Sequence, residues 1–250
     1  MAVRLLFMIC LLKFVIGKQE GFIVGGEYVN SIKDFAHVAY LELYGKKSEV
    51  MVCGSSILNQ KILITAAHCL VIAVNITVYA GTLDKYKGNI HRVDRIKLHE
   101  QYDDETLAND IGLVRLKKPL SLGKTMKKVI IMKKPPKVKM AEVAGWGFIS
   151  DNTREILKYT AQKLWNHKKC KKFIFPEVPD SNGKICGGEM KGQEDYASTG
   201  DSGNGLMVNK NIIIGIVCCA VSKSQTLMVY TDVPYYYKWI KVASRKLACS

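Results

Sequence analysis

The chain contains the segment Ile62-Leu63-Ile64-Thr65-Ala66-Ala67-His68-Cys69, and this stretch decides the fold. Its first three residues are large and apolar and two of them are β-branched, so they predict a short buried strand. His68 comes directly after that strand and is a candidate general base. A single histidine in such a place is equally well explained as a hydrogen-bonded core residue beside a disulfide, so the rest of the chain has to decide.

Short apolar or β-branched runs recur on both sides of this segment, most of them bounded by Gly, Asn, Asp, Lys or Pro. They are Val50–Val52, Ile76–Tyr79, Ile111–Leu116, Ala141–Ala144, Ile212–Val217 and Leu227–Thr231. This pattern favours an all-β antiparallel barrel or sandwich over alternating strands and helices. Only the tail, Pro234–Leu247, predicts a helix, with Pro at a permitted first-turn position and apolar residues at helical spacing. The Lys-rich stretch around Pro135-Pro136 is the natural crossing point between two halves.

The first residues differ from the rest of this chain of 250 residues. Arg4 precedes an apolar run that is too short to span a bilayer as a stable helix, which is typical of a signal peptide over residues 1–17. Lys13 interrupts that apolar run, and the alternative to a signal peptide is an uncleaved membrane anchor. We expect a short propeptide at 18–22, a single catalytic domain at 23–250, and a secreted, extracellular protein without a membrane span.

Export makes disulfides plausible. Without Cys10, seven cysteines are left, and an odd number means that at least one thiol is unpaired or bonds another molecule. Apart from the adjacent Cys218-Cys219, they lack the repeated close pairs of a zinc site, and adjacent residues do not chelate one zinc comfortably. We therefore expect neither a metal nor another cofactor.

The formal net charge is +15, with the densest basic cluster between Lys124 and Lys139. Such a surface can attract nucleic acid, anionic polysaccharide or an anionic membrane. The cluster has no interleaved aromatic residues and no nucleic-acid motif. A solvated connecting segment is the favoured interpretation, with polysaccharide contact as the alternative and no nucleic-acid partner.

Two further segments complete a hydrolytic constellation with His68. Asp110 lies in Asn109-Asp110-Ile111-Gly112-Leu113, at the edge of an apolar run, and Ser202 lies in Gly200-Asp201-Ser202-Gly203, where glycines let the backbone approach a substrate. Peptide hydrolysis needs a nucleophile, a base, a group that orients the base, and donors for an oxyanion. Each residue alone has an ordinary structural explanation, but the joint pattern favours catalysis.

In these segments the sequence resembles the trypsin/chymotrypsin family of serine proteases. The resemblance extends to several other segments in the same order, so that it covers residues 23–240: Ile23-Val24-Gly25-Gly26, Cys53-Gly54-Ser55-Ser56, Ala144-Gly145-Trp146-Gly147, Lys184-Ile185-Cys186, Val229-Tyr230-Thr231 and Trp239-Ile240. It implies two packed six-stranded antiparallel β-barrels with a C-terminal α-helix. It also implies the disulfides Cys53–Cys69 and Cys170–Cys186.

The resemblance assigns roles residue by residue. Ser202 would attack the carbonyl carbon, His68 would take and return the proton, and Asp110 would hold the imidazole tautomer. The backbone N–H groups of Gly200 and Ser202 would form the oxyanion hole. After cleavage, the new amino terminus at Ile23 would pair with Asp201 and shape that hole.

The substrate pocket departs from the family. Ser198 stands where a cysteine is usual, so one common disulfide is missing, and Asn204-Gly205 replaces the usual Gly-Pro. Tyr196 aligns with the pocket floor and Met228 with a wall glycine, which predicts a preference for small or modest apolar side chains. A slip of one residue would put Asp195 at the floor and predict cleavage after Arg or Lys instead.

The substrate-binding strand and the activation site are also unusual. Cys218-Cys219-Ala220 replaces serine, tryptophan and glycine on that strand. A Cys218–Cys219 bridge would be strained, a bridge from either one to Cys249 would tether the terminal helix, and buried thiols are the third possibility. Phe22 precedes the cleavage site, so a chymotrypsin-like protease is expected to be the activator.

Together these features predict a monomeric secreted serine endopeptidase that is made as a zymogen and acts on protein or peptide substrates. The alternative is a weakly active or inactive homologue that binds a protein partner. The crowded pocket and the missing disulfide favour that alternative, and the complete triad opposes it.

Overall fold

The computed structural model describes residues 23, 26–46, 49–147, 156–173, 181–188, 196–197, 200–221 and 224–249. The expected signal peptide and propeptide lie outside these residues. Among the described helices, none has both the length and the apolar character needed to cross a membrane.

The first half of the chain forms a closed barrel of six antiparallel strands. In chain order these are β2 (Val38–Tyr44), β3 (Val50–Ile57), β4 (Ile62–Thr65), β5 (Asn75–Ala80), β6 (Asn89–Leu98) and β7 (Gly112–Leu116). They pair around the barrel in the order β2-β3-β4-β7-β6-β5. The barrel interior is filled by fully buried aliphatic side chains such as Leu41, Ile64 and Leu113, so the apolar runs of the sequence become the core.

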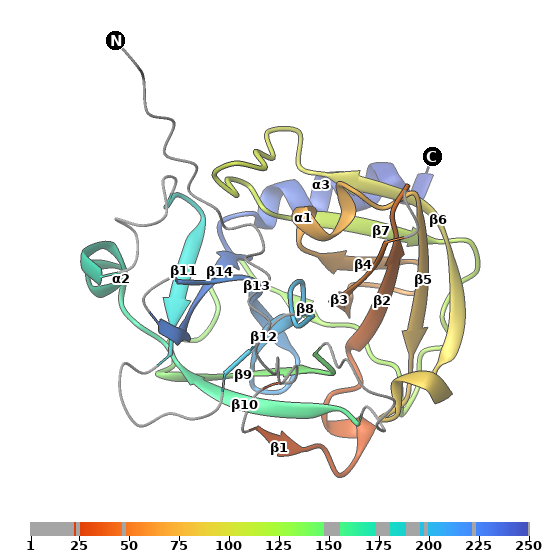
Figure 1. Cartoon of the computed structure of the whole chain (residues 1–250), viewed down its shortest axis with the longest axis horizontal. Helices are drawn as coiled ribbons and strands as arrows, with labels where there is room; N and C mark the ends of the chain where they lie inside the picture. Colours follow the sequence, from red (N-terminus) through yellow and green to blue (C-terminus); the bar gives the residue numbers. More distant parts are fainter. Residues whose placement is uncertain are drawn as a thin grey trace.

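The second half of the chain, joined by the short strand β1 (Glu27–Tyr28) from near the start of the chain, forms a sheet of eight strands that lies beside the first barrel (Figure 1). Its other strands are β8 (Ile130–Ile131), β9 (Met140–Gly145), β10 (Lys158–Lys163), β11 (Lys184–Gly187), β12 (Gly205–Val208), β13 (Ile212–Val221) and β14 (Ser224–Asp232). The sheet order is β1-β10-β9-β12-β13-β14-β11, and β8 pairs with β13 in parallel.

An isolated bridge between Leu164 and Gly187 joins the end of β10 to β11. It is supported by a hydrogen bond from the Trp165 N–H to the Cys186 carbonyl, at 3.0 Å. This bridge closes β10, β9, β12, β13, β14 and β11 into a second ring of six antiparallel strands, and β1 and β8 are additions to it. The predicted all-β architecture of two six-stranded barrels is therefore confirmed.

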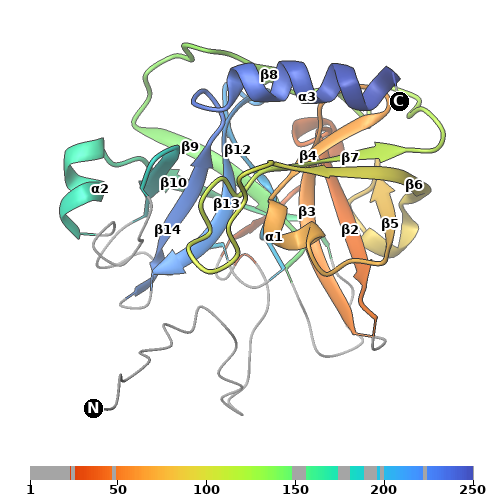
Figure 2. The ribbon, with the colours of Figure 1, turned by 90° about the horizontal axis from the view of Figure 1, so that it is seen from above.

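Three α-helices and two 3-10 helices complete the described structure: α1 (Ala67–Leu70), α2 (His167–Phe173), α3 (Tyr237–Cys249), η1 (Ile32–Asp34) and η2 (Lys85–Lys87). The predicted terminal helix exists, but it begins at Tyr237, because residues 233–236 form turns that precede it. Its apolar face buries Ile240, Ala243 and Leu247 against the first barrel, along β6 and β7 (Figure 2). The helix therefore fastens the end of the chain to the opposite half.

The Lys-rich segment connects the two barrels, as predicted. Met126 and Val129 are buried in the core of the first barrel, whereas all seven lysines between residues 124 and 139 are exposed. This division of side chains matches a connecting segment that is anchored by a few apolar residues and solvated by its charges.

Candidate active site

His68 lies in the short helix α1, which connects β4 to β5 of the first barrel. All four residues of β4 are buried, and the small side chains Ala66 and Ala67 let the chain turn at once into the short helix α1. The disulfide Cys53–Cys69 ties this turn to β3. As a result the imidazole of His68 is held at the barrel edge with a side chain that is 20% exposed.

Asp110 faces His68 with both carboxylate oxygens. The His68 backbone N–H donates to Oδ1 of Asp110 at 2.9 Å, and His68 Nδ1 lies 2.8 Å from Oδ2. The Asp110 side chain is fully buried. Burial by itself raises the pKa of Asp110, but the charge of His68 and its hydrogen bonds outweigh this, so that the net pKa lies below its ordinary value. Asp110 is therefore an ionised acceptor that fixes the ring orientation and leaves Nε2 on the side of the ring away from the carboxylate.

The loop before Asp110 is held by contacts from distant parts of the chain. Asn109 has a positive φ of 54°, a conformation that Asn tolerates better than most residues, and its side-chain oxygen accepts a hydrogen bond from Tyr236 Oη at 3.0 Å. Thr231 on β14 donates its hydroxyl to the Asp110 carbonyl at 2.7 Å. No local sequence pattern predicts these contacts, because residues 109, 231 and 236 come together only in the folded chain.

Ser202 reaches the same place from the second barrel. The Gly54 N–H donates to the Ser202 carbonyl at 2.7 Å, and the sulfur of Cys69 lies 3.8 Å from that carbonyl. Gly203 has a φ of +84°, and a Cβ there would overlap Thr65 Oγ1 and the Gly54 carbonyl. Only glycine therefore permits the serine loop to pack this closely against the strands that carry His68.

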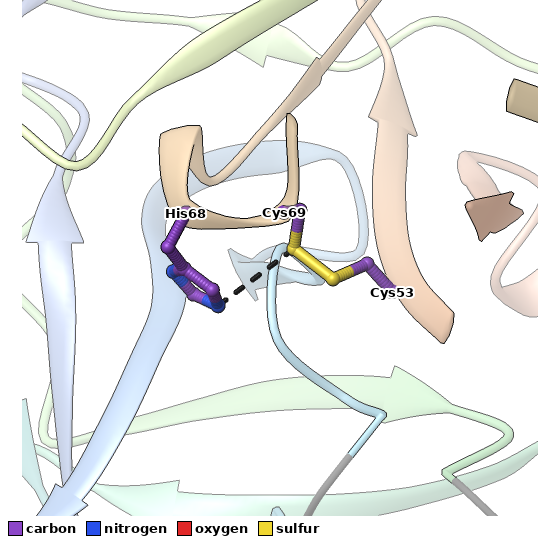
Figure 3. Close-up of side chains that lie close together, drawn as sticks. All are labelled: Cys53, His68 and Cys69. Carbon is purple, nitrogen blue, oxygen red and sulfur yellow. Dashed lines mark hydrogen bonds between the residues drawn. A yellow bond between two sulfur atoms is a disulfide. The ribbon is translucent and has the colours of Figure 1, made fainter. Parts of the chain in front are cut away.

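The Cys53–Cys69 disulfide lies beside His68 (Figure 3). His68 Nε2 lies 3.7 Å from the sulfur of Cys69. Of the described residues, Cys53, His68 and Cys69 are the one group whose ligand atoms could gather around an ion. Since both sulfurs belong to the Cys53–Cys69 bridge, they are not the thiolates that a metal requires.

The two candidate activation residues, Ile23 and Asp201, are both buried on the side of the molecule that the second sheet forms. Asp201 is fully buried and its Oδ1 accepts a hydrogen bond from the Gly147 N–H at 3.1 Å. The Ile23 side chain is also fully buried, in a cluster with residues of β9, β12 and β13. Gly200, the candidate oxyanion residue, has a φ of +90°.

The described candidate pocket residues, Met228 and Tyr196, are buried or partly buried. Met228 on β14 is 3% exposed and belongs to the same core cluster as Ala197, Val217 and Tyr230. Tyr196 is partly buried beside Ala197. The residues between Gly188 and Tyr196, with Asp195 among them, and residues 198–199 lie outside the described part of the chain.

The three cysteines that the sequence left open are thiols in this structure. Cys249 is exposed at the end of α3, Cys218 is buried and Cys219 is partly exposed, whereas Ala220 is exposed. Cys218 donates a hydrogen bond to Cys219 Sγ at 3.6 Å. Cys218 also lies near Asp110, whose charge raises the pKa of the Cys218 thiol together with burial. The sequence analysis expected Cys218 on the candidate substrate-binding strand, and its proximity to Asp110 is visible only in the fold.

The second disulfide pairs Cys170 of α2 with Cys186 of β11. Both pairs that the resemblance implied are thus formed. This disulfide fastens the short helix α2 to the second barrel, near the β-bridge between Leu164 and Gly187.

Comparisons with known proteins agree with this arrangement. The family model described as Trypsin matches residues 23–240. The chain is 33% identical to trypsin eta of Drosophila melanogaster over 241 residues, covering 90% of each chain, and 28% identical to granzyme B of Rattus norvegicus over 239 residues, covering 91% of this chain and 93% of the relative.

Solved structures share the fold at lower identity. A structure titled HL collagenase has a TM-score of 0.77 and 24% identity, covering 88% of this chain and 98% of its own. A scabies mite inactivated protease paralogue, S-I1, has a TM-score of 0.76 and 23% identity, covering 89% and 99%.

Proposed function

Because the chain belongs to the trypsin family of serine proteases, we propose that it is a serine endopeptidase with His68, Asp110 and Ser202 as its catalytic triad. The observation that carries this proposal is the two-point contact of Asp110 with His68. A buried carboxylate that binds both the backbone N–H and Nδ1 of one histidine leaves that ring a single tautomer, with a lone pair on Nε2.

In the proposed reaction, Nε2 of His68 takes the proton from Ser202 Oγ as the oxygen bonds to the carbonyl carbon of a peptide. The backbone N–H groups of Gly200 and Ser202 stabilise the resulting oxyanion. His68 then gives the proton to the leaving amine, and water hydrolyses the acyl-enzyme by the same steps in reverse. Asp110 stays ionised and stabilises the imidazolium.

Secretion and activation by proteolysis are part of the proposal. Residues 1–17 would be removed as a signal peptide, and cleavage between Phe22 and Ile23 would free an amino group for Asp201. The burial of both Ile23 and Asp201 supports this step, because an amino group freed at a buried Ile23 would need a buried acid to balance its charge.

The proposed specificity follows from Met228. Its side chain is buried among Ala197, Val217 and Tyr230, so it fills space that a glycine would leave open. We therefore propose cleavage after small or modest apolar residues. A panel of chromogenic peptides tests this, and fast cleavage after Arg would refute it.

The test of the function itself is labelling by a fluorescent fluorophosphonate, before and after chymotrypsin cuts Phe22–Ile23. Labelling that requires the cut and is lost in Ser202→Ala supports a zymogen with a working triad. Absence of labelling, with Ile23 verified as the amino terminus, refutes the proposal. It would favour the second candidate, an inactive homologue that binds a protein partner, for which the buried Met228 is the supporting observation.

A further inference from the structure

Cys218 and Cys219 lie at an irregularity of β13. The pairing with β14 runs from Val217 opposite Tyr230 directly to Cys219 opposite Val229, so Cys218 is an extra residue in the ladder. In a regular strand, adjacent side chains point to opposite faces of the sheet. A β-bulge removes that alternation, and here the two sulfurs lie 3.6 Å apart. The bulge therefore turns two neighbouring cysteines into a dithiol.

The two thiols have different surroundings. Cys218 is 4% exposed and lies close to the charge of Asp110, while Cys219 is partly exposed on the strand where substrate is proposed to bind. The hydrogen bond to Cys219 lowers the pKa of Cys218, but burial and the charge of Asp110 outweigh it and raise the pKa overall, so Cys218 keeps the proton that it donates to Cys219 Sγ. An accessible thiol next to a buried second thiol is the arrangement of a reactive and a resolving cysteine.

We propose that Cys218 and Cys219 form a modification site for peroxides, and that its oxidation lowers the activity by moving the Cys218 sulfur, which lies beside Asp110. Hydrogen peroxide oxidises the Cys219 thiol to a sulfenic acid and releases one water. The Cys218 sulfur then displaces the sulfenic oxygen, which leaves as a second water, and a Cys218–Cys219 disulfide forms. Two thiols and one peroxide thus yield one disulfide and two waters, and a dithiol reductant reverses the reaction.

The effect on catalysis follows from the contacts of Asp110. In the reduced protein its buried carboxylate accepts hydrogen bonds from the His68 backbone and from His68 Nδ1, and Cys218 lies near enough for the charge of Asp110 to raise the thiol pKa. Oxidation removes the Cys218 proton and draws its sulfur toward Cys219. A displaced group beside a buried charge is expected to reduce kcat by a factor on the order of ten. This effect rests on the proposed function, whereas the thiol chemistry does not.

The sequence allows a direct assay of the thiol chemistry. Trypsin cuts after Lys210 and Lys223, so the peptide Asn211–Lys223 contains Cys218 and Cys219 and no other cysteine. The full chain, activated at Ile23, is treated with hydrogen peroxide, alkylated to block remaining thiols, and digested. We expect this peptide to lose two hydrogens and to escape alkylation, and peptidase activity to fall in step with it and to return with dithiothreitol.

Two variants serve as controls. Cys249→Ser removes the exposed thiol at the end of α3, far in sequence from the triad, and should leave both the basal activity and the response to peroxide unchanged. Cys219→Ser removes one half of the dithiol. Peroxide should therefore cause no loss of activity in this variant that dithiothreitol can reverse.

Failure of the inference is distinguishable from failure of the proposed function. An alkylated Asn211–Lys223 peptide after peroxide overturns the modification site, whether or not the protein is active. A disulfide that forms without any fall in activity overturns the switch. If the protein proves inactive, the His68 Nδ1 proton is followed by NMR instead, and a resonance that does not move when the disulfide forms overturns the link to Asp110.

Discussion

Replacement of Asp110 by asparagine tests how the structure controls the tautomer of His68. Oδ1 of Asp110 accepts from the His68 backbone N–H and Oδ2 lies against Nδ1. Asparagine has the same shape but offers one oxygen and one NH₂ group. The backbone N–H can only donate, so the amide oxygen must face it, and the NH₂ group then faces Nδ1. Nδ1 becomes an acceptor, the proton moves to Nε2, and His68 can no longer take a proton from Ser202.

The magnitude follows from the alternative arrangement. If the amide is flipped to restore the Nδ1 proton, its NH₂ group faces the backbone N–H, and two buried donors are left unsatisfied. Each costs about 1–3 kcal/mol, so the productive state lies about 2–6 kcal/mol above the unproductive one. This corresponds to a fall in kcat of about 10² to 10⁴, and loss of the negative charge beside the imidazolium moves the value toward the upper end.

The assay is kcat on the best peptide of the chromogenic panel, for protein activated at Ile23 and compared at equal concentrations of folded protein. Asp34→Asn is the matched control, because Asp34 is exposed and its ion pair in the described part of the chain is with the exposed Lys210, at 3.4 Å. It should stay within about twofold of the wild type. A kcat for Asp110→Asn within tenfold of the wild type would refute the tautomer argument.

Three further predictions concern specificity and stability. Met228→Gly opens the space now filled by a buried side chain. On the panel of chromogenic peptides, relative kcat/KM should then shift toward larger apolar residues such as Phe. An unchanged preference would mean that Met228 does not define the pocket. His37 is buried, and burial lowers its pKa to about 4. Between pH 6.5 and pH 4 the unfolded chain therefore binds a proton at His37 more readily than the folded chain does. A contribution to the free energy of unfolding on the order of 3 kcal/mol is present above pH 6.5 and is lost as the pH falls through this window. Urea unfolding at pH 7 and pH 4 should show a smaller pH dependence in His37→Leu than in the wild type, and equal slopes would contradict the assignment. Replacing Cys170 and Cys186 by alanine removes a disulfide that closes a loop with a sequence separation of 16. The free energy of unfolding should fall by about 3 kcal/mol, and the urea midpoint should fall with it. The Cys249→Ser variant is the control, and an equal midpoint in both variants would show that the disulfide does not stabilise the fold.

Much of the candidate site could be read from local sequence. The apolar run before His68, the acid at the edge of the run that becomes β7, and the glycines around Ser202 are local patterns, since each depends on residues within a few positions of one another. The two disulfides came with the same family resemblance. Polar strands were harder to recognise: β6 and β10 are rich in charged residues, because their outer faces are solvated, and the apolar pattern did not predict them.

By itself, the sequence determined the all-β class and the terminal helix through its patterning, and the two disulfides and the residues proposed as the triad through short motifs that resemble a known family. Only the tertiary structure decided what those residues touch. The bond from Thr231 to the Asp110 carbonyl joins residues 121 positions apart, and no local pattern carries such a contact. The dithiol is the clearest case, because adjacent cysteines on a regular strand would point apart. The bulge of β13 brings Cys218 and Cys219 together behind Asp110, and a bulge is set by the register between two strands, which forms only when the barrel closes.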